Sequence, residues 1–77
     1  MIQLQLENYD SALPILVEWK MLPTFDWNTI DTSFTIENDV LSFEYDFTSV
    51  GLPVNYDIHI RVIQNEIELI RQIHTIK

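Results

Sequence analysis

The stretch YDIHIRVI contains the side chains that come nearest to a catalytic arrangement. Asp57, His59 and Arg61 alternate with apolar residues, so on a β-strand all three would project from one face. A histidine beside a carboxylate is the usual general base, and an arginine could hold an anion. No serine or cysteine can be placed beside His59, however. We therefore predict no catalytic residue, and we expect Arg61 to balance acids on neighbouring strands, such as Glu44 or Asp46.

The many acidic residues do not follow a metal-binding pattern. An EF-hand loop requires the run D-x-[DN]-x-[DN]-G, which this sequence lacks. His59 and His74 are too far apart for the HxH or HxxxH spacing of a zinc site. The chain has no cysteine, so thiolate ligands and disulfides are excluded. We predict neither a bound metal nor a cofactor.

The charge of the chain is strongly unbalanced, with 12 acidic and four basic residues and a net charge of −8. Such a protein repels nucleic acids and anionic lipids, because phosphate binding depends on Lys and Arg. It attracts basic proteins instead. The bland alternative is that the acidity only keeps a small protein soluble. No Lys or Arg lies between Lys20 and Arg61, whereas seven acids do: Asp26, Asp31, Glu37, Asp39, Glu44, Asp46 and Asp57.

This acidic series suggests a function. Carboxylates spaced along a rigid sheet can imitate a nucleic-acid backbone and occupy the basic cleft of an enzyme. We predict an inhibitor of the immunity-protein or antitoxin type that binds a basic protein, such as a nuclease. The alternatives are a phage-type anti-restriction or anti-CRISPR mimic, and a structural subunit that associates with itself. The predicted partner-binding residues are Asp26, Trp27, Glu37, Asp39, Glu44, Tyr45, Asp46 and Asp57.

Two aromatic residues are included in this set as interface anchors, a role in which Trp and Tyr are favoured. Trp27 belongs to the FDW run, in which two large aromatics flank an acid. The alternative for Phe25 and Trp27 is that they close the open end of a small core. Tyr45 falls on the predicted core face of its strand, so its assignment to an interface is less direct.

Alternation with a period of two residues predicts β-strands along most of the chain. The clearest element is a hairpin over residues 33–47, in which END supplies the turn. On its second strand one face is apolar and the other carries Ser42, Glu44 and Asp46. Strands are also predicted over Ile2–Leu6, residues 13–21 and residues 56–63, with a loop or strand edge over residues 22–32. A short helix over residues 13–21 is the alternative there.

The C-terminal segment fits two patterns. Isoleucines in this segment satisfy either a strand or one face of a helix over residues 65–76, with Asn65 as its cap. The run IQNEI at residues 63–67 resembles IENDV at residues 36–40, which favours a second hairpin turn. We therefore predict a mainly β fold, a small antiparallel sheet folded as a sandwich or partial barrel. The alternative is an α+β fold with this helix packed on the sheet.

Length sets the remaining expectations. A chain of 77 residues makes one domain, over residues 1–77, and buries a modest share of its surface. A homodimer would add buried area, and the sequence leaves that question open. The first residues lack the pattern of a signal peptide, and no apolar run approaches a membrane span. With the absence of cysteine, these features predict a cytoplasmic protein that does not bind membranes.

Overall fold

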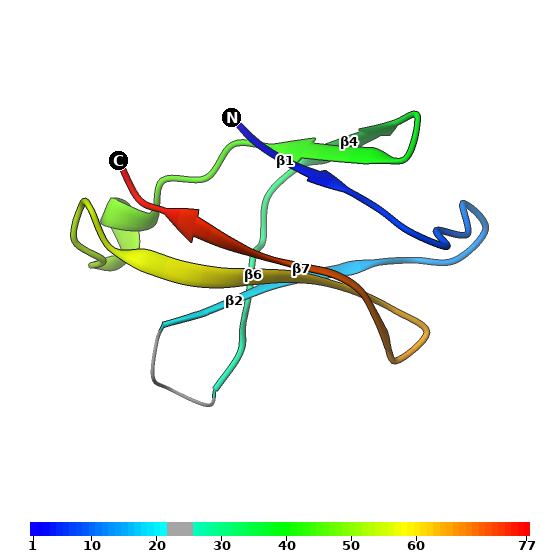
Figure 1. Ribbon diagram of the computed structural model, residues 1–77. Coiled ribbons are helices and arrows are strands. Elements are labelled where there is room, and N and C mark those ends of the chain that lie inside the picture. Colours follow the sequence, from blue (N-terminus) through cyan, green and yellow to red (C-terminus); the bar gives the residue numbers. More distant parts are fainter. Residues whose placement is uncertain (22–25) are drawn as a thin grey trace.

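The computed structural model describes residues 1–21 and 26–77, and strands dominate this part of the chain (Figure 1). The predicted mainly β, sandwich-like fold is confirmed, with two small antiparallel sheets. The three-stranded sheet has the order β1-β5-β4, formed by Ile2–Gln5, Val40–Phe43 and Phe34–Glu37. The four-stranded sheet has the order β3-β2-β6-β7, formed by Asn28–Thr29, Leu16–Met21, Asp57–Gln64 and Ile67–Thr75. A 3-10 helix, η1, covers Phe47–Val50.

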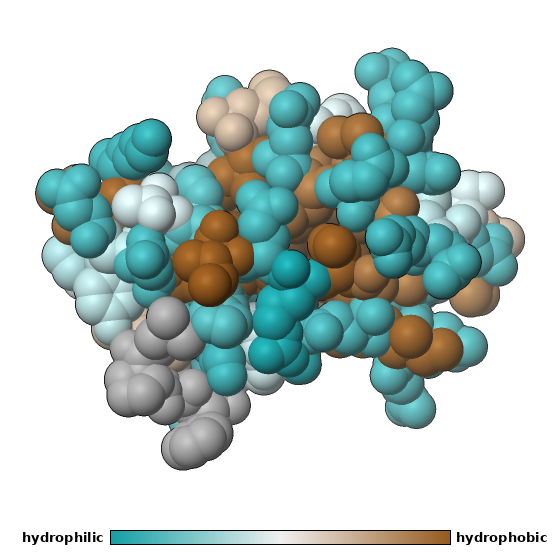
Figure 2. All heavy atoms as spheres, viewed as in Figure 1, coloured by the Kyte–Doolittle hydropathy of each residue, from teal (hydrophilic) through white to brown (hydrophobic). Residues whose placement is uncertain are grey.

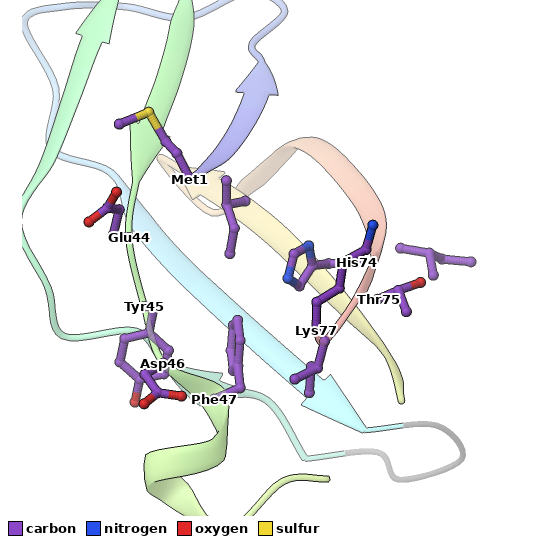
Figure 3. Close-up of a pocket in the computed structure, with 11 residues that line it drawn as sticks. Met1, Glu44, Tyr45, Asp46, Phe47, His74, Thr75 and Lys77 are labelled. Carbon is purple, nitrogen blue, oxygen red and sulfur yellow. The ribbon is translucent and has the colours of Figure 1, made fainter. Parts of the chain in front are cut away.

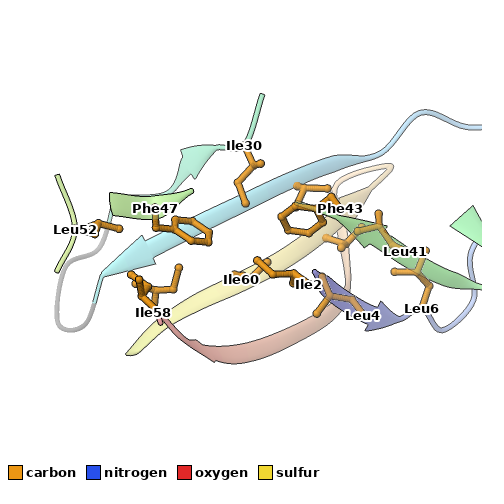
Figure 4. Close-up of a cluster of buried hydrophobic side chains, with 13 residues drawn as sticks. Ile2, Leu4, Leu6, Ile30, Leu41, Phe43, Phe47, Leu52, Ile58 and Ile60 are labelled. Carbon is orange, nitrogen blue, oxygen red and sulfur yellow. The ribbon is translucent and has the colours of Figure 1, made fainter. Parts of the chain in front are cut away.

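The core lies between the two sheets and depends most on β6 (Figure 4). Ile58, Ile60 and Val62 of this strand have no exposed surface, and they alternate with the outward-facing charged residues. Leu4 of β1 and Leu41 of β5 are equally buried in the opposite layer. Burying one such side chain stabilises the fold by roughly 1.5–3 kcal/mol. The period-two pattern in the sequence therefore selects both the strand and the face that it buries.

Gln64 is a buried polar residue at the end of β6, with 4% of its surface exposed. Its Nε2 donates hydrogen bonds to the main-chain oxygens of Asp10 and Leu13, at 2.7 and 3.1 Å. Its Oε1 accepts a hydrogen bond from the Asp10 N–H at 2.9 Å. A buried amide is tolerated when its hydrogen bonds are satisfied. These bonds attach the connection between β1 and β2 to the four-stranded sheet.

The two hairpins turn in the same way, as the internal similarity of the sequence predicts. Asn38 and Asp39 have φ angles of 51° and 62°, and Asn65 and Glu66 have φ angles of 52° and 63°. Two successive residues with positive φ form the type I′ turn that matches the twist of a two-residue hairpin. Asparagine tolerates this left-handed conformation better than most residues, which explains its place at the start of both turns.

The alternative of a C-terminal helix over residues 65–76 is wrong. The segment forms β7, which pairs with β6 from Gln64 opposite Ile67 to Asp57 opposite Thr75. The left-handed turn at residues 65 and 66 reverses the chain at the point where the helix would begin. The isoleucines of this segment then suit a pleated surface, where β-branched residues pack well.

Glu66 occupies a left-handed position without the tolerance of asparagine or glycine, so the substitution Glu66→Gly should stabilise the protein. We expect the free energy of unfolding to rise by about 0.5–1 kcal/mol, because relief of the left-handed strain exceeds the entropic cost of glycine. Urea denaturation measures this change. Asp39→Gly at the same place in the other hairpin is the matched control and should give a smaller gain. A loss of stability in Glu66→Gly alone would contradict this account.

Candidate functional site

A groove at one end of the sandwich brings together three of the predicted partner-binding residues (Figure 3). It has a volume of about 840 Å³ and opens between the two layers. One wall is the segment that follows β5, with Glu44, Tyr45 and Asp46 in sequence, and the facing wall is the end of β7 and the residues after it. The residues lining the groove are Met1, Ile2, Glu44, Tyr45, Asp46, Phe47, Ile73, His74, Thr75, Ile76 and Lys77.

The position of the acidic wall differs from the prediction, which placed it on the second strand of the hairpin over residues 33–47. Strand β5 ends at Phe43, so Glu44 and Asp46 do not project from a pleated sheet. Asp46 ends the extended segment because its Oδ1 accepts hydrogen bonds from the N–H and the hydroxyl of Thr48. Its main-chain oxygen also accepts from the Ser49 hydroxyl at 2.6 Å. These contacts cap η1, a role for which aspartate is favoured.

The same contacts hold Asp46 in its ionised form. Hydrogen bonds from the Thr48 side chain and main chain lower the pKa of the Asp46 carboxyl from its ordinary value of 3.8. The side chain is exposed and its orientation is fixed by the cap. The groove therefore carries a permanent negative charge in a defined position at neutral pH.

Aromatic rings form the floor beneath this acidic wall. The ring of Phe47 is buried and lies 4.8 Å from that of Tyr45 and 5.9 Å from that of Trp19, both in edge-to-face geometry. Such pairs add about 0.5–1.5 kcal/mol beyond the burial of their surface. The Tyr45 side chain is half-buried, so it packs against the core and also lines the groove. Its predicted place on the core face is therefore compatible with its place in the groove.

His74 enters the groove from β7, and sequence reasoning assigned it no role. Its imidazole lies 5.8 Å from the Phe47 ring, and burial lowers its pKa below the ordinary 6.5. The positive charges of the N-terminal amine and Lys77 act in the same direction. No local motif indicates this contact, because His74 and Phe47 meet only when the two layers pack together.

The basic residues are concentrated on a different surface, which we call the Trp27 cluster. It consists of Trp27 with Lys20, Arg61 and Arg71 on the outer face of the four-stranded sheet. The Arg61 Cζ lies 3.9 Å from the centre of the Trp27 ring, and Lys20 Nζ and Arg71 Cζ lie 5.1 Å from it. Cations over an indole ring are attracted by its π-electrons. Three of the four basic residues of the chain are thus held away from the acidic wall.

Arg61 does balance an acid on a neighbouring strand, but the acids expected for this role, Glu44 and Asp46, are wrong. Arg61 instead forms an ion pair with Glu18 of β2 at 2.8 Å, because the strand register places these two residues opposite each other. The other ion pair within the described ranges, residues 1–21 and 26–77, joins Arg71 to Glu68 at 2.8 Å. Neither pair involves a predicted partner-binding acid.

Asp57, His59 and Arg61 share the outer face of β6, as the alternation predicts, since the residues between them are buried. The His59 Nδ1 is buried and has no hydrogen-bond partner within the described part of the chain. Asp57 accepts a hydrogen bond from the hydroxyl of Thr75, a groove residue, and so lies at the border of the groove.

The remaining predicted residues lie away from the groove. Glu37 and Asp39 are at the tip of the β4–β5 hairpin, beyond the opposite end of β5. Asp26 is exposed beside Trp27, which belongs to the outer face and not to the buried core. Phe25 of the FDW run lies outside the described residues. The acids of the middle third therefore form separate groups, of which Glu44 and Asp46 make one, while Asp57 lies on the outer face of β6.

Comparisons with protein-family models, curated proteins and solved structures find no match. Within the two described ranges, no group of three or more histidine or acidic residues is placed to hold a metal ion. No helix in these ranges is long and apolar enough to cross a membrane. The geometry of the chain itself is therefore the basis for assigning a function.

The lowered pKa of His74 predicts how stability depends on pH. As the pH falls from about 7.5 to 5.5, the unfolded state takes up a proton at His74 before the folded state does, so the free energy of unfolding falls. This contribution is fully present above the folded and unfolded pKa values. Urea denaturation at both pH values measures it. His74→Gln should reduce the slope, and an unchanged slope in His74→Gln would contradict the prediction.

Proposed function

We propose that this protein is an acidic inhibitor of the immunity-protein or antitoxin type, which binds a basic protein and blocks its active site. The observation that supports this proposal most directly is the unpaired acidic wall of the groove. Glu44 and Asp46 stand there together, and the ion pairs of the described chain use Glu18 and Glu68 instead. Their charges are thus available to a partner.

Positive and negative charges lie on different surfaces of the molecule, which makes the proposed binding surface predominantly acidic. Lys20, Arg61 and Arg71 are gathered around Trp27, so most of the positive charge is remote from the acidic wall. Lys77 and the N-terminal amine of Met1 are the positive groups among the groove residues. With a net charge of −8, the whole molecule attracts a basic partner and speeds the encounter at low salt.

Affinity would come from the aromatic and apolar part of the groove. Tyr45 is half-buried over Phe47, and a partly buried tyrosine is a favoured anchor because it offers a large rigid surface and a hydroxyl. The acids would select and orient the partner while these side chains supply contact area. A basic enzyme such as a nuclease has the complementary surface.

The double variant Glu44→Gln with Asp46→Asn tests this proposal. Asparagine still offers an oxygen to the Thr48 N–H, so the cap of η1 is kept while both charges are removed. Partners are first captured on the immobilised protein at low salt and identified, and the affinity of a purified partner is then measured by calorimetry together with loss of its activity. We expect binding to weaken about tenfold or more and its dependence on salt to decrease.

The matched control is Glu7→Gln with Glu66→Gln, which removes two exposed charges that the proposal does not use. It should change affinity by much less. Glu37→Gln with Asp39→Asn forms a third arm, which measures whether the hairpin tip contributes. If the groove variant binds every captured basic partner as tightly as the wild type does, or if the partners keep full activity when bound, the inhibitor proposal is rejected.

A further inference from the structure

The open edge of β7 is the feature from which we draw a second, independent inference. We propose that two copies of this chain pair antiparallel along residues 71–75 of β7, so that their four-stranded sheets become continuous. The other edge strands are short, with four residues in β1 and β4 and two in β3, whereas β7 has nine. A long unpaired edge is a template for another strand, and short edges are one way to avoid such pairing.

The hydrogen bonds at the end of β7 show which main-chain groups face this edge. The Ile76 N–H donates to the Tyr56 oxygen at 2.9 Å, and the Ile76 oxygen accepts from the Asn55 N–H, so both groups of Ile76 point toward the β6 side. Main-chain groups alternate in direction along an antiparallel strand. The N–H and C=O groups of Thr75, Ile73 and Arg71 therefore point to the open edge.

Symmetry limits how two such edges can pair. A two-fold axis places one residue of β7 opposite its own copy, either an outward-directed residue (Arg71, Ile73 or Thr75) in a hydrogen-bonded pair or an intervening one (Gln72 or His74) in a non-hydrogen-bonded pair. A centre at Gln72 sets Arg71 opposite Ile73, whose β6 neighbour is His59, and a centre at His74 sets Arg71 opposite Lys77, a like charge. A centre at Arg71 opposes two like charges, which is unfavourable. A centre at Thr75 pairs only the last part of the strand. A centre at Ile73 pairs the whole regular segment and sets Arg71 opposite Thr75 of the second copy.

The Ile73-centred register is also complementary in charge. Asp57 is the β6 neighbour of Thr75 and accepts a hydrogen bond from its hydroxyl. In the paired sheet, the long side chain of Arg71, which lies near Trp27 in one copy, is able to turn across Thr75 and reach Asp57 of the second copy. Within one copy, Arg71 pairs with Glu68 at 2.8 Å, so in the dimer it exchanges or shares this contact with Asp57 of the second copy.

Apolar surface lies along the same side of the molecule. In Figure 1, β1 and β7 are the strands nearest the viewer, and Figure 2 shows apolar side chains gathered between the two layers on that side. Ile73 is 57% exposed at the proposed axis, where it would pack on its own copy. Surface of this kind loses contact with water when a second sheet continues the first.

A charge-swap experiment tests the register by sedimentation velocity at near-physiological salt. The wild type should show a dimer that increases with protein concentration. In a dimer of Arg71→Glu, each new glutamate meets Asp57 of the other copy, and in a dimer of Asp57→Lys, each new lysine meets Arg71 of the other copy. Because like charges then meet at both contacts, each variant alone should dimerise at least about tenfold more weakly. A mixture of the two variants restores opposite charges at both contacts and should recover the dimer. Circular dichroism confirms that each variant is folded.

A cross-linking experiment tests the axis itself, since the chain has no cysteine of its own. Under mild oxidation, Ile73→Cys should form a disulfide-linked dimer, because the two residues at the axis lie within disulfide distance in paired strands. Val54→Cys is the control, with 56% exposure close to the 57% of Ile73, and should cross-link much more slowly.

The two experiments can overturn the proposal separately from the inhibitor function. A wild type that stays monomeric at high concentration rejects it. So does a dimer that the single charge variants leave unchanged, or one in which Val54→Cys cross-links as fast as Ile73→Cys. None of these results depends on a basic partner, so binding through Glu44 and Asp46 would remain a separate question.

Discussion

Burial of one face of β6 is the constraint on which the rest of the structure depends. Ile58, Ile60 and Val62 are fully buried, and the strand carrying them lies between β2 and β7. A small chain without disulfides relies on apolar burial of this kind to offset the entropy of folding. Because alternate residues of β6 must therefore face inward, Asp57, His59 and Arg61 must face outward. The charged outer surface is thus a consequence of the core.

The outer face in turn determines where charge is left uncompensated. Arg61 lies opposite Glu18 in the strand register and stacks on Trp27, which also contacts two further cations. Since the chain has four basic residues in all, this single cluster takes up most of them. Acids elsewhere, including those of the groove, then have few cations to meet. The distribution of a small number of basic residues, more than the number of acids, creates the acidic wall.

The sequence predicts the strands well because their alternation follows directly from burial, and it predicts both hairpin turns because Asn38 and Asn65 occupy left-handed positions. It misplaces the end of the second strand of the first hairpin, although the cause is local. The strand prediction runs past Phe43 because Phe47 continues the alternation, whereas in the structure the Asp46 cap redirects the chain. A cap of this kind is local, so D-F-T-S could have indicated it.

The groove and the Trp27 cluster are harder to predict, because each joins segments that are distant in sequence. His74 meets Phe47 only across the two layers, and Trp27 meets Arg71 only after β6 and β7 have paired. Period-two alternation specifies which face a side chain takes but not which strand becomes its neighbour. The predicted acids were therefore correctly expected at the surface, while their division into separate groups depended on the strand order.

Pairing of two copies through the β7 edge and binding of a basic partner through the acidic surface depend differently on salt. One small domain is therefore able to support both contacts. Net charge opposes the approach of two identical copies over long distances, and salt screens this repulsion. Edge pairing depends on main-chain hydrogen bonds and apolar contact, which salt does not weaken in the same way. The β-bulge between Val62 and Ile63 disturbs the first part of β7 and leaves Arg71 to Thr75 regular. The irregular half is thus protected against pairing, and the regular half, next to the groove, is the part of the sheet that remains open to it.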